Sequence, residues 1–99
     1  MVERRDFKRL PAETEINIRQ VDKEGMKIGT GKDISGGGIM IESPHQFEPG
    51  TLLDIEVFTR THKSFQRVFK PLSARVRVVR VEGDNPPYSI AAEFVEVEQ

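Results

Sequence analysis

The residues of this sequence best suited to chemistry lie in a short polar and glycine-rich stretch at positions 32–38, KDISGGG. Asp33 and Ser35 are two positions apart, so an extended strand would place both side chains on one face and Ile34 on the other. Three successive glycines cost folding entropy, but they allow a ligand or a neighbouring strand to approach the backbone closely. The stretch therefore predicts a polar binding turn. The alternative is a plain hairpin in which Asp33 and Ser35 bond only to their own turn.

A second group with chemical potential is the basic cluster at positions 4–9, RRDFKR, which holds four cations against one carboxylate. Arg5 and Arg9 are four residues apart, so one turn of helix or a similarly wound loop would project both guanidinium groups to the same side. Leu10 should be extended, because the following Pro11 disfavours the α region for the residue before it. The cluster predicts a hinged basic arm, and the alternative is a solvated terminal segment without a ligand.

Other catalytic and metal chemistry finds little support in the sequence. His45 and His62 lie in polar segments without a third ligand at metal spacing. The serines have no neighbouring base in a nucleophile-elbow context, and the glycine run lacks the G-x-x-x-x-G-K pattern of a phosphate loop. We therefore expect no enzyme activity, no metal and no cofactor.

Composition narrows the class of protein further. The chain has 99 residues, enough for one domain with a modest core, and its 15 Lys and Arg nearly balance its 16 Asp and Glu. Such a balance disfavours a protein that coats DNA or RNA by counterion release. There are no cysteines, which suits a reducing cytoplasmic setting. The apolar runs are too short for a membrane span, and the charged N-terminus is unlike a signal peptide.

Alternation of apolar and polar residues predicts an all-β chain without helices. The clearest strand has Leu53, Ile55 and Val57 on one face and acidic residues on the other. A change of phase between Val78 and Val79 predicts a bulge or a strong twist. Six or seven short strands separated by turn signals favour a small Greek-key barrel or a sandwich. The expected strands are residues 13–20, 26–34, 38–42, 52–58, 69–81 and 88–97.

The two candidate groups together resemble the sequence signature of the PilZ domain, the bacterial receptor module for cyclic di-GMP. Arg5-x-x-x-Arg9 matches the family pattern R-x-x-x-R, and Asp33-x-Ser35-x-x-Gly38 matches (D/N)-x-(S/A)-x-x-G. The motifs occur in the family's order, and the resemblance extends over nearly the whole chain. Either motif alone would be a weak signal, whereas the ordered pair is specific.

The resemblance implies a six-stranded Greek-key β-barrel over residues 12–99, preceded by a flexible basic N-terminal arm of residues 1–11. The closing strand of the family often carries Gly where Ala91 aligns, which is a small-for-small difference. The sequence ends at Gln99, which leaves no room for the helix that often follows the barrel. Dimerisation through such a helix is therefore not expected.

The resemblance also implies that the arm folds over cyclic di-GMP held against the turn. A guanidinium fork matches the O6 and N7 edge of guanine and also matches a phosphate, which are the roles expected of Arg5 and Arg9. Asp33 would accept hydrogen bonds from the guanine N1–H and N2–H₂ donors. Ser35 would add a further hydrogen bond, and Gly38 would permit close approach.

Arg4 extends the basic arm and could stack on a base or bridge a second nucleotide, which favours an intercalated ligand dimer. The expected function is that of a receptor or adaptor whose arm is ordered by ligand binding. With no second domain in the sequence, it would signal to an unidentified effector protein in trans, in motility, exopolysaccharide production or another process that the family serves.

Two other functions are compatible with an all-β domain. The same barrel could be a protein-interaction module with an idle nucleotide site, although the intact Arg5, Arg9, Asp33 and Ser35 argue against it. An OB-like barrel for single-stranded nucleic acid would need aromatic stacking positions along a basic face. The seven aromatic residues fall mostly at expected core positions, which disfavours that class.

Overall fold

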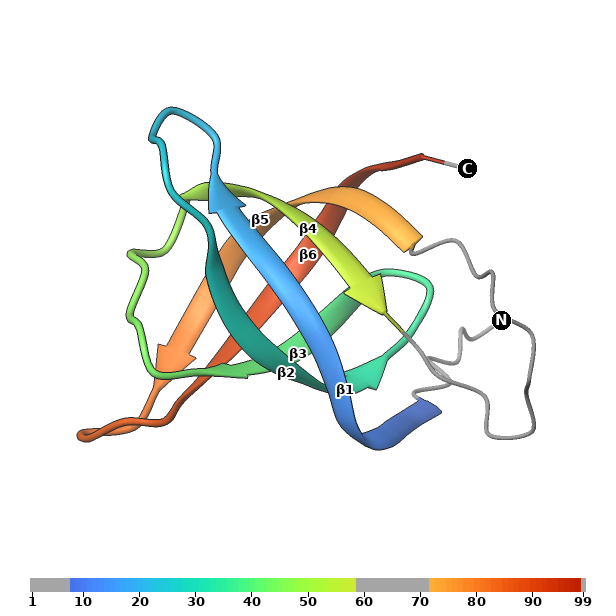
Figure 1. Ribbon diagram of the computed structural model, residues 1–99, viewed down its shortest axis with the longest axis horizontal. Coiled ribbons are helices and arrows are strands. Elements are labelled where there is room, and N and C mark those ends of the chain that lie inside the picture. Colours follow the sequence, from blue (N-terminus) through green and yellow to red (C-terminus); the bar gives the residue numbers. More distant parts are fainter. Residues whose placement is uncertain (1–7, 59–71, 99) are drawn as a thin grey trace, which may run out of the picture.

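Six antiparallel strands form a closed barrel in the structure, a computed structural model that describes residues 8–58 and 72–98, with only the backbone of residues 8, 9 and 11–13. The strands follow one another around the barrel in the order β1-β2-β3-β6-β5-β4 (Figure 1). The described residues contain no helix, and the predicted all-β class and six-stranded barrel are thereby confirmed. The strands are β1 (Lys8–Gln20), β2 (Lys27–Ile34), β3 (Gly38–Ser43), β4 (Leu52–Phe58), β5 (Leu72–Glu82) and β6 (Tyr88–Glu98).

The barrel interior is filled by the inward-facing side chains, which alternate with outward-facing ones along the strands. In β4, Leu53, Ile55 and Val57 are at most 2% exposed, while Asp54 and Glu56 face outward as predicted. Burial of these aliphatic side chains is the main force that closes the sheet on itself. The buried hydrophobic residues are Ile16, Ile18, Ile39, Ile41, Phe47, Leu53, Ile55, Val57, Ala74, Val76, Val78, Ile90 and Ala92.

The first strand begins earlier than the sequence pattern indicates. We expected it over residues 13–20, but β1 starts at Lys8, because Lys8 and Arg9 pair with the end of β2. The register between β1 and β2 shifts between Arg9 and Thr14, around the Leu10-Pro11 dipeptide predicted to act as a hinge. The last residues of the expected arm, 8–11, thus lie in β1, and the division of the chain at residue 11 stays a prediction.

The change of phase expected in β5 is present as an irregularity of the sheet. The pairing of β5 with β6 shifts register between Val78 and Arg80. Val78 is buried, whereas Val79 is 48% exposed. The predicted start of this strand at residue 69 falls outside the described residues.

The inward positions of β2 are occupied by glycine, and this brings β1 close. A Cβ atom on Gly31 would lie 2.8 Å from Leu10 Cδ1 and 2.9 Å from Ile16 Cδ1. The large side chains of β1 therefore fill the space that β2 leaves. Two apolar residues of the expected second strand are exposed instead. Met26, just before β2, is 56% exposed, and Ile28, within β2, is 54% exposed.

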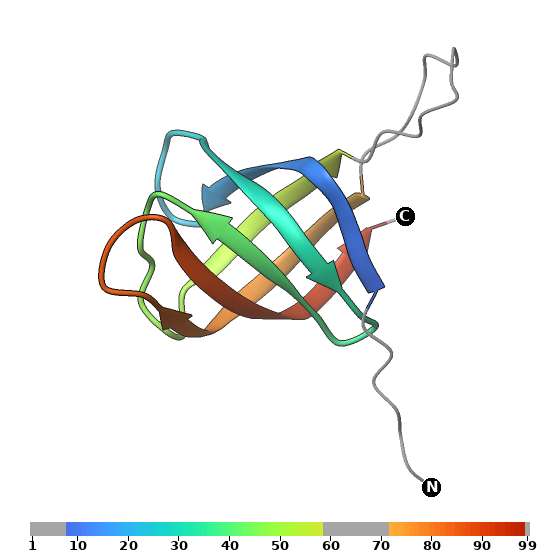
Figure 2. The same ribbon diagram turned by 90° about the horizontal axis from the view of Figure 1, so that it is seen from below.

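The strand order sets β2 and β3 on the wall of the barrel opposite β4 and β5. Figure 2 shows the start of β1 beside the end of β2 and the β2–β3 turn. Two regions rich in polar residues therefore lie on opposite walls. Among the described residues, no helix has the length and apolar character to cross a membrane.

Candidate functional site

The predicted binding turn is the short connection between β2 and β3. Ser35 donates its backbone N–H to the carbonyl of Gly38 at 2.9 Å, and the Ser35 hydroxyl accepts a hydrogen bond from the Gly37 N–H at 3.3 Å. Part of the plain-hairpin interpretation is thus correct, because Ser35 stabilises its own turn. Apart from the glycine itself and its two chain neighbours, no described atom lies within 4 Å of the position that a Cβ atom would take on Gly36 or Gly37. The tip of the turn is therefore not crowded by side chains of the described residues, although both backbone polar groups of Gly37 are hydrogen-bonded.

Gly38 fits against another strand rather than against open space. A Cβ atom at this position would lie 2.5 Å from the carbonyl oxygen of Ala92 in β6. The neighbouring Gly37 carbonyl accepts a hydrogen bond from Phe94 N–H at 3.0 Å. Of the two uses expected for the glycine run, close approach of a neighbouring strand is the one seen at Gly38. This contact fixes the turn on the barrel wall.

The two sequence motifs meet at the end of β2. Arg9 is the register partner of Asp33 in the β1–β2 ladder, and Lys8 is the partner of Ile34. Asp33 is half-buried, and it also pairs with Met40 of β3. Directly opposed residues of an antiparallel pair have Cβ atoms about 4.5–5.5 Å apart. The backbone pairing therefore sets the second arginine position of the first motif opposite the aspartate of the second motif.

The structure brings together only part of the predicted set. Asp33, Ser35 and Gly38 lie in one connection, and the backbone of Arg9 lies beside it. Arg4 and Arg5 fall outside the described residues. The ligand-binding role of all six residues stays a prediction.

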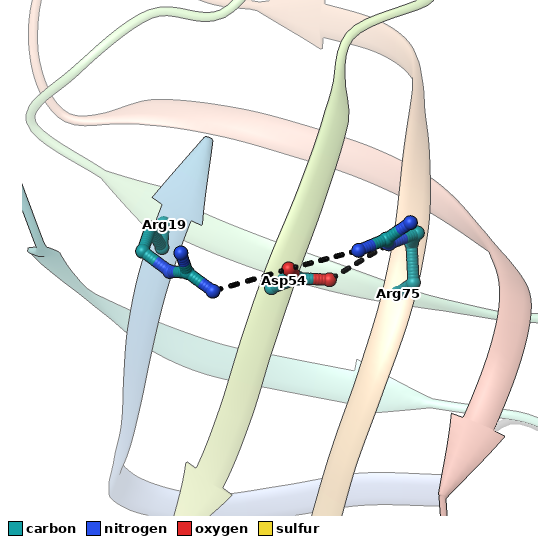
Figure 3. A network of polar contacts seen from close by, with 3 residues as sticks. All are labelled: Arg19, Asp54 and Arg75. Atoms are coloured by element: carbon teal, nitrogen blue, oxygen red, sulfur yellow. Dashed lines mark hydrogen bonds and ion pairs between the residues drawn. The ribbon is translucent and has the colours of Figure 1, made fainter. Parts of the chain in front are cut away.

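A second polar cluster lies on the opposite wall and has a different character. Arg75 Nε donates to Asp54 Oδ1 at 2.9 Å, and Arg75 Nη2 donates to Asp54 Oδ2 at 3.2 Å (Figure 3). Arg19 Nη2 reaches the same Oδ2 at 3.4 Å from the other side. The hydrogen bonds from Arg75 hold the pKa of Asp54 below its usual range, assisted by the charges of both arginines and opposed by partial burial. This network joins β1, β4 and β5.

This network was not predicted from the sequence. The alternation placed Asp54 outward on its strand, and Arg75 is likewise at an outward position of its own strand. The sequence feature that could have indicated the network is the presence of opposite charges at outward positions of different strands. Which charges meet depends on the register, which pairs Asp54 with both Arg19 and Arg75.

Comparison with protein families identifies the class of this domain. The model of the PilZ domain matches residues 3–99, so it covers both motifs and every strand. The chain belongs to the PilZ domain family. PilZ domains are in general receptor or adaptor modules for cyclic di-GMP in bacterial second-messenger signalling, and their known role is non-enzymatic.

A solved structure of similar fold is the Bacillus subtilis inhibitor of motility, MotI/DgrA. The match has a TM-score of 0.71 at 20% sequence identity and covers 98% of this chain. This chain corresponds to 45% of that chain's length. At this identity the likeness supports the barrel fold. A search of curated proteins found no match.

Proposed function

We propose that this PilZ domain binds cyclic di-GMP at the β2–β3 turn and passes the signal to a partner protein in trans. The observation that carries the proposal is the register pairing of Arg9 with Asp33. The pairing sets the backbone of an arginine opposite an aspartate, and these two residue types suit a ligand with both phosphates and guanine edges. The open tip at Gly36 and Gly37 supports close approach of the ligand to the backbone.

The individual contacts follow from the chemistry of the side chains. Arg5 and Arg9 hold phosphates and the O6/N7 edge of guanine, and Asp33 accepts from its N1–H and N2–H₂ groups. Ser35 adds a hydrogen bond, although it must share its hydroxyl with the Gly37 N–H. Gly38 contributes indirectly, because its contact with β6 fixes the turn.

Calorimetric titration of the 99-residue protein with cyclic di-GMP tests this proposal. We expect a heat of binding with a dissociation constant below about 100 μM, which corresponds to a binding free energy near 5.5 kcal/mol. Absence of binding at that concentration would favour the alternative, a protein-interaction barrel with an idle nucleotide site. If Arg4 contacts a second nucleotide, the stoichiometry is two ligands per chain and falls towards one in Arg4→Ala.

Binding should also order the basic arm. Arg4, Arg5, Lys8 and Arg9 carry like charges, and the ligand phosphates supply the opposite charge that holds them together. Amide hydrogen exchange should therefore slow on ligand addition, chiefly in residues 4–10 and 33–38. Equal protection of residues 4–7 with and without ligand would contradict an ordering step while leaving binding itself intact.

The proposed partner is an effector protein, and the proposed place of action is the cytoplasm, which suits a sequence without cysteine. Motility is one process in which to look for the partner, since the similar structure is an inhibitor of motility.

A further inference from the structure

A groove of about 510 Å³ crosses the outer surface of β1, β4, β5 and β6, on the wall opposite the β2–β3 turn. The register arranges its polar residues in two rows that run across these four strands. The first row is Arg19, Asp54, Arg75 and Glu96, and the second row is Asn17, Glu56, Ser73 and Glu98.

The two rows differ in how their charges are compensated. Charges alternate in sign along the first row, and Asp54 is bonded by both arginines (Figure 3). The second row has two carboxylates, Glu56 and Glu98, and no cation. Among the described residues, neither of these two carboxylates forms an ion pair or a hydrogen bond. The groove as a whole has four carboxylates against two guanidinium groups.

The distance between the second-row carboxylates suits a bound cation. Glu56 and Glu98 are on β4 and β6, with Ser73 of β5 between them. Neighbouring strands are about 4.8 Å apart, so the two backbone positions are separated by about 10 Å. This separation is about one Debye length at 0.1 M salt, so the two carboxylates repel each other only weakly, whereas a cationic side chain between them would be attracted by both.

The remaining lining favours a polypeptide over a small cation. Asn17 and Ser73 provide a side-chain amide and a hydroxyl that can bond to peptide groups. Met26, which is 56% exposed, offers a polarisable apolar surface at the same groove. The groove volume falls in the range of pockets that hold drug-sized ligands, about 300–1,000 Å³.

We propose that this acidic groove is the docking surface for a basic and partly apolar segment of the partner protein. An arginine or lysine side chain would lie between Glu56 and Glu98, and an apolar side chain would contact Met26. The inference rests on the proposed function for its output in trans, and it adds the surface and the chemistry of the partner. Because the groove is on the opposite wall from the turn, one chain can hold ligand and partner together.

The experiment uses the 99-residue protein without nucleotide and a blocked hexapeptide containing two arginines, two leucines and two serines. In NMR titration, we expect amide shifts to concentrate at residues 17–19, 54–56, 73–75 and 96–98. The double variant Glu56→Gln, Glu98→Gln should weaken binding about tenfold, which is the loss expected for two exposed ion pairs at the favourable end of their range.

The matched control is the double variant Glu48→Gln, Asp84→Asn, which loses the same charge from exposed loop positions outside the groove. We expect it to change the peptide affinity less than about twofold, as screened distant charges should. If the two double variants lose the same peptide affinity, the loss comes from the overall charge of the protein and the proposal is overturned. Peptide-induced shifts spread over the whole barrel, or equal binding of a peptide with glutamate in place of arginine, would also overturn it.

Spermine separates a peptide site from a general cation site. Spermine binding at the same residues with an affinity equal to that of the peptide would overturn the polypeptide assignment. Cyclic di-GMP titration of the groove double variant makes the two proposals separable, because we expect unchanged nucleotide binding there. If the groove double variant loses peptide binding but still binds nucleotide, the groove is the peptide site. If the wild type binds no nucleotide, the proposed function fails and the groove proposal is judged by the peptide alone.

Discussion

On the β4–β5 wall, Asp54 accepts hydrogen bonds from Arg75 and Arg19, so both of its carboxylate oxygens are bonded to side chains of neighbouring strands. At the β2–β3 turn, by contrast, Ser35 accepts one hydrogen bond at 3.3 Å, and the Cβ positions of Gly36 and Gly37 have no neighbour within 4 Å in the described part of the chain other than adjacent residues. Both regions carry arginines and carboxylates on adjacent strands. The difference is that the charged side chains of the first wall bond one another across strands, whereas the turn is held by backbone contacts and has no described neighbour at the Cβ positions of Gly36 and Gly37.

Residue types alone therefore do not distinguish a binding site from a structural ion-pair network. Arg19 is at an outward position of β1, and its charge is directed at Asp54. Arg9 is in the same strand, and the register opposes it to Asp33 beside an open turn. The surroundings of each pair decide whether a ligand can reach it.

The largest expected effect is on nucleotide affinity. Arg9→Ala, and likewise Arg5→Ala, should cost about 2–5 kcal/mol of cyclic di-GMP binding, the range for truncating one member of a close charged pair. Arg19→Ala is the matched control, because it removes an arginine from the same strand as Arg9 but on the opposite wall. Calorimetric titration should show unchanged affinity in Arg19→Ala. An equal loss in Arg19→Ala would mean that the two walls do not differ in function.

A smaller effect is expected on the stability of the turn. Gly38→Ala should lower the free energy of unfolding by about 1–3 kcal/mol, because the added methyl group would collide with the Ala92 carbonyl. Gly37→Ala should cost less than about 1 kcal/mol, since its Cβ would meet open space and Gly37 is not among the glycines with positive φ. Urea unfolding of both variants measures the difference. Similar losses in the two would show that the close approach at Gly38 is not what fixes the turn.

The smallest effect concerns the ion-pair network, and it depends on pH. The pKa of Asp54 is lowered in the folded state, so its contribution to stability is present above the ordinary aspartate pKa of about 4. That contribution is lost as the pH falls through the lowered value. At pH 7, Asp54→Asn should lower the free energy of unfolding by about 1 kcal/mol, a modest figure because the side chains of Arg19 and Arg75 are 48% and 40% exposed to solvent.

Urea unfolding at pH 7 and near pH 2 tests the sign of this effect. We expect the difference between the wild type and Asp54→Asn to shrink towards zero in acid. Glu56→Gln on the same strand is the control, with a change within about 0.5 kcal/mol, because Glu56 forms no ion pair among the described residues. A difference that grows in acid would contradict the assigned direction of the pKa shift.

Much of the barrel followed from patterns of neighbouring residues. The alternation of Leu53, Ile55 and Val57 with outward carboxylates predicted β4 with its observed bounds. The change of phase at Val78 and Val79 predicted the irregularity of β5. Such features are local, because the side-chain period of a strand allows one face to be buried and the other to be solvated.

The early start of β1 and the inward glycines of β2 were not predicted. Lys8 and Arg9 are polar and show no alternation, and their strand backbone depends on pairing with the end of β2. Gly31 has no side chain to mark an inward position, and its burial depends on Leu10 and Ile16 from another strand. Patterns within one segment contain no information about contacts of this kind.

The family signature, the strand periodicity and the residue types of the candidate site are all present in the order of the amino acids. Which of these residues meet depends on the folded barrel. It brought Arg9 opposite Asp33, fixed Gly38 against Ala92, and paired Asp54 with Arg75. The physical reason is that periodicity arises from each strand alone, whereas register arises from hydrogen bonds and packing between segments distant in the chain.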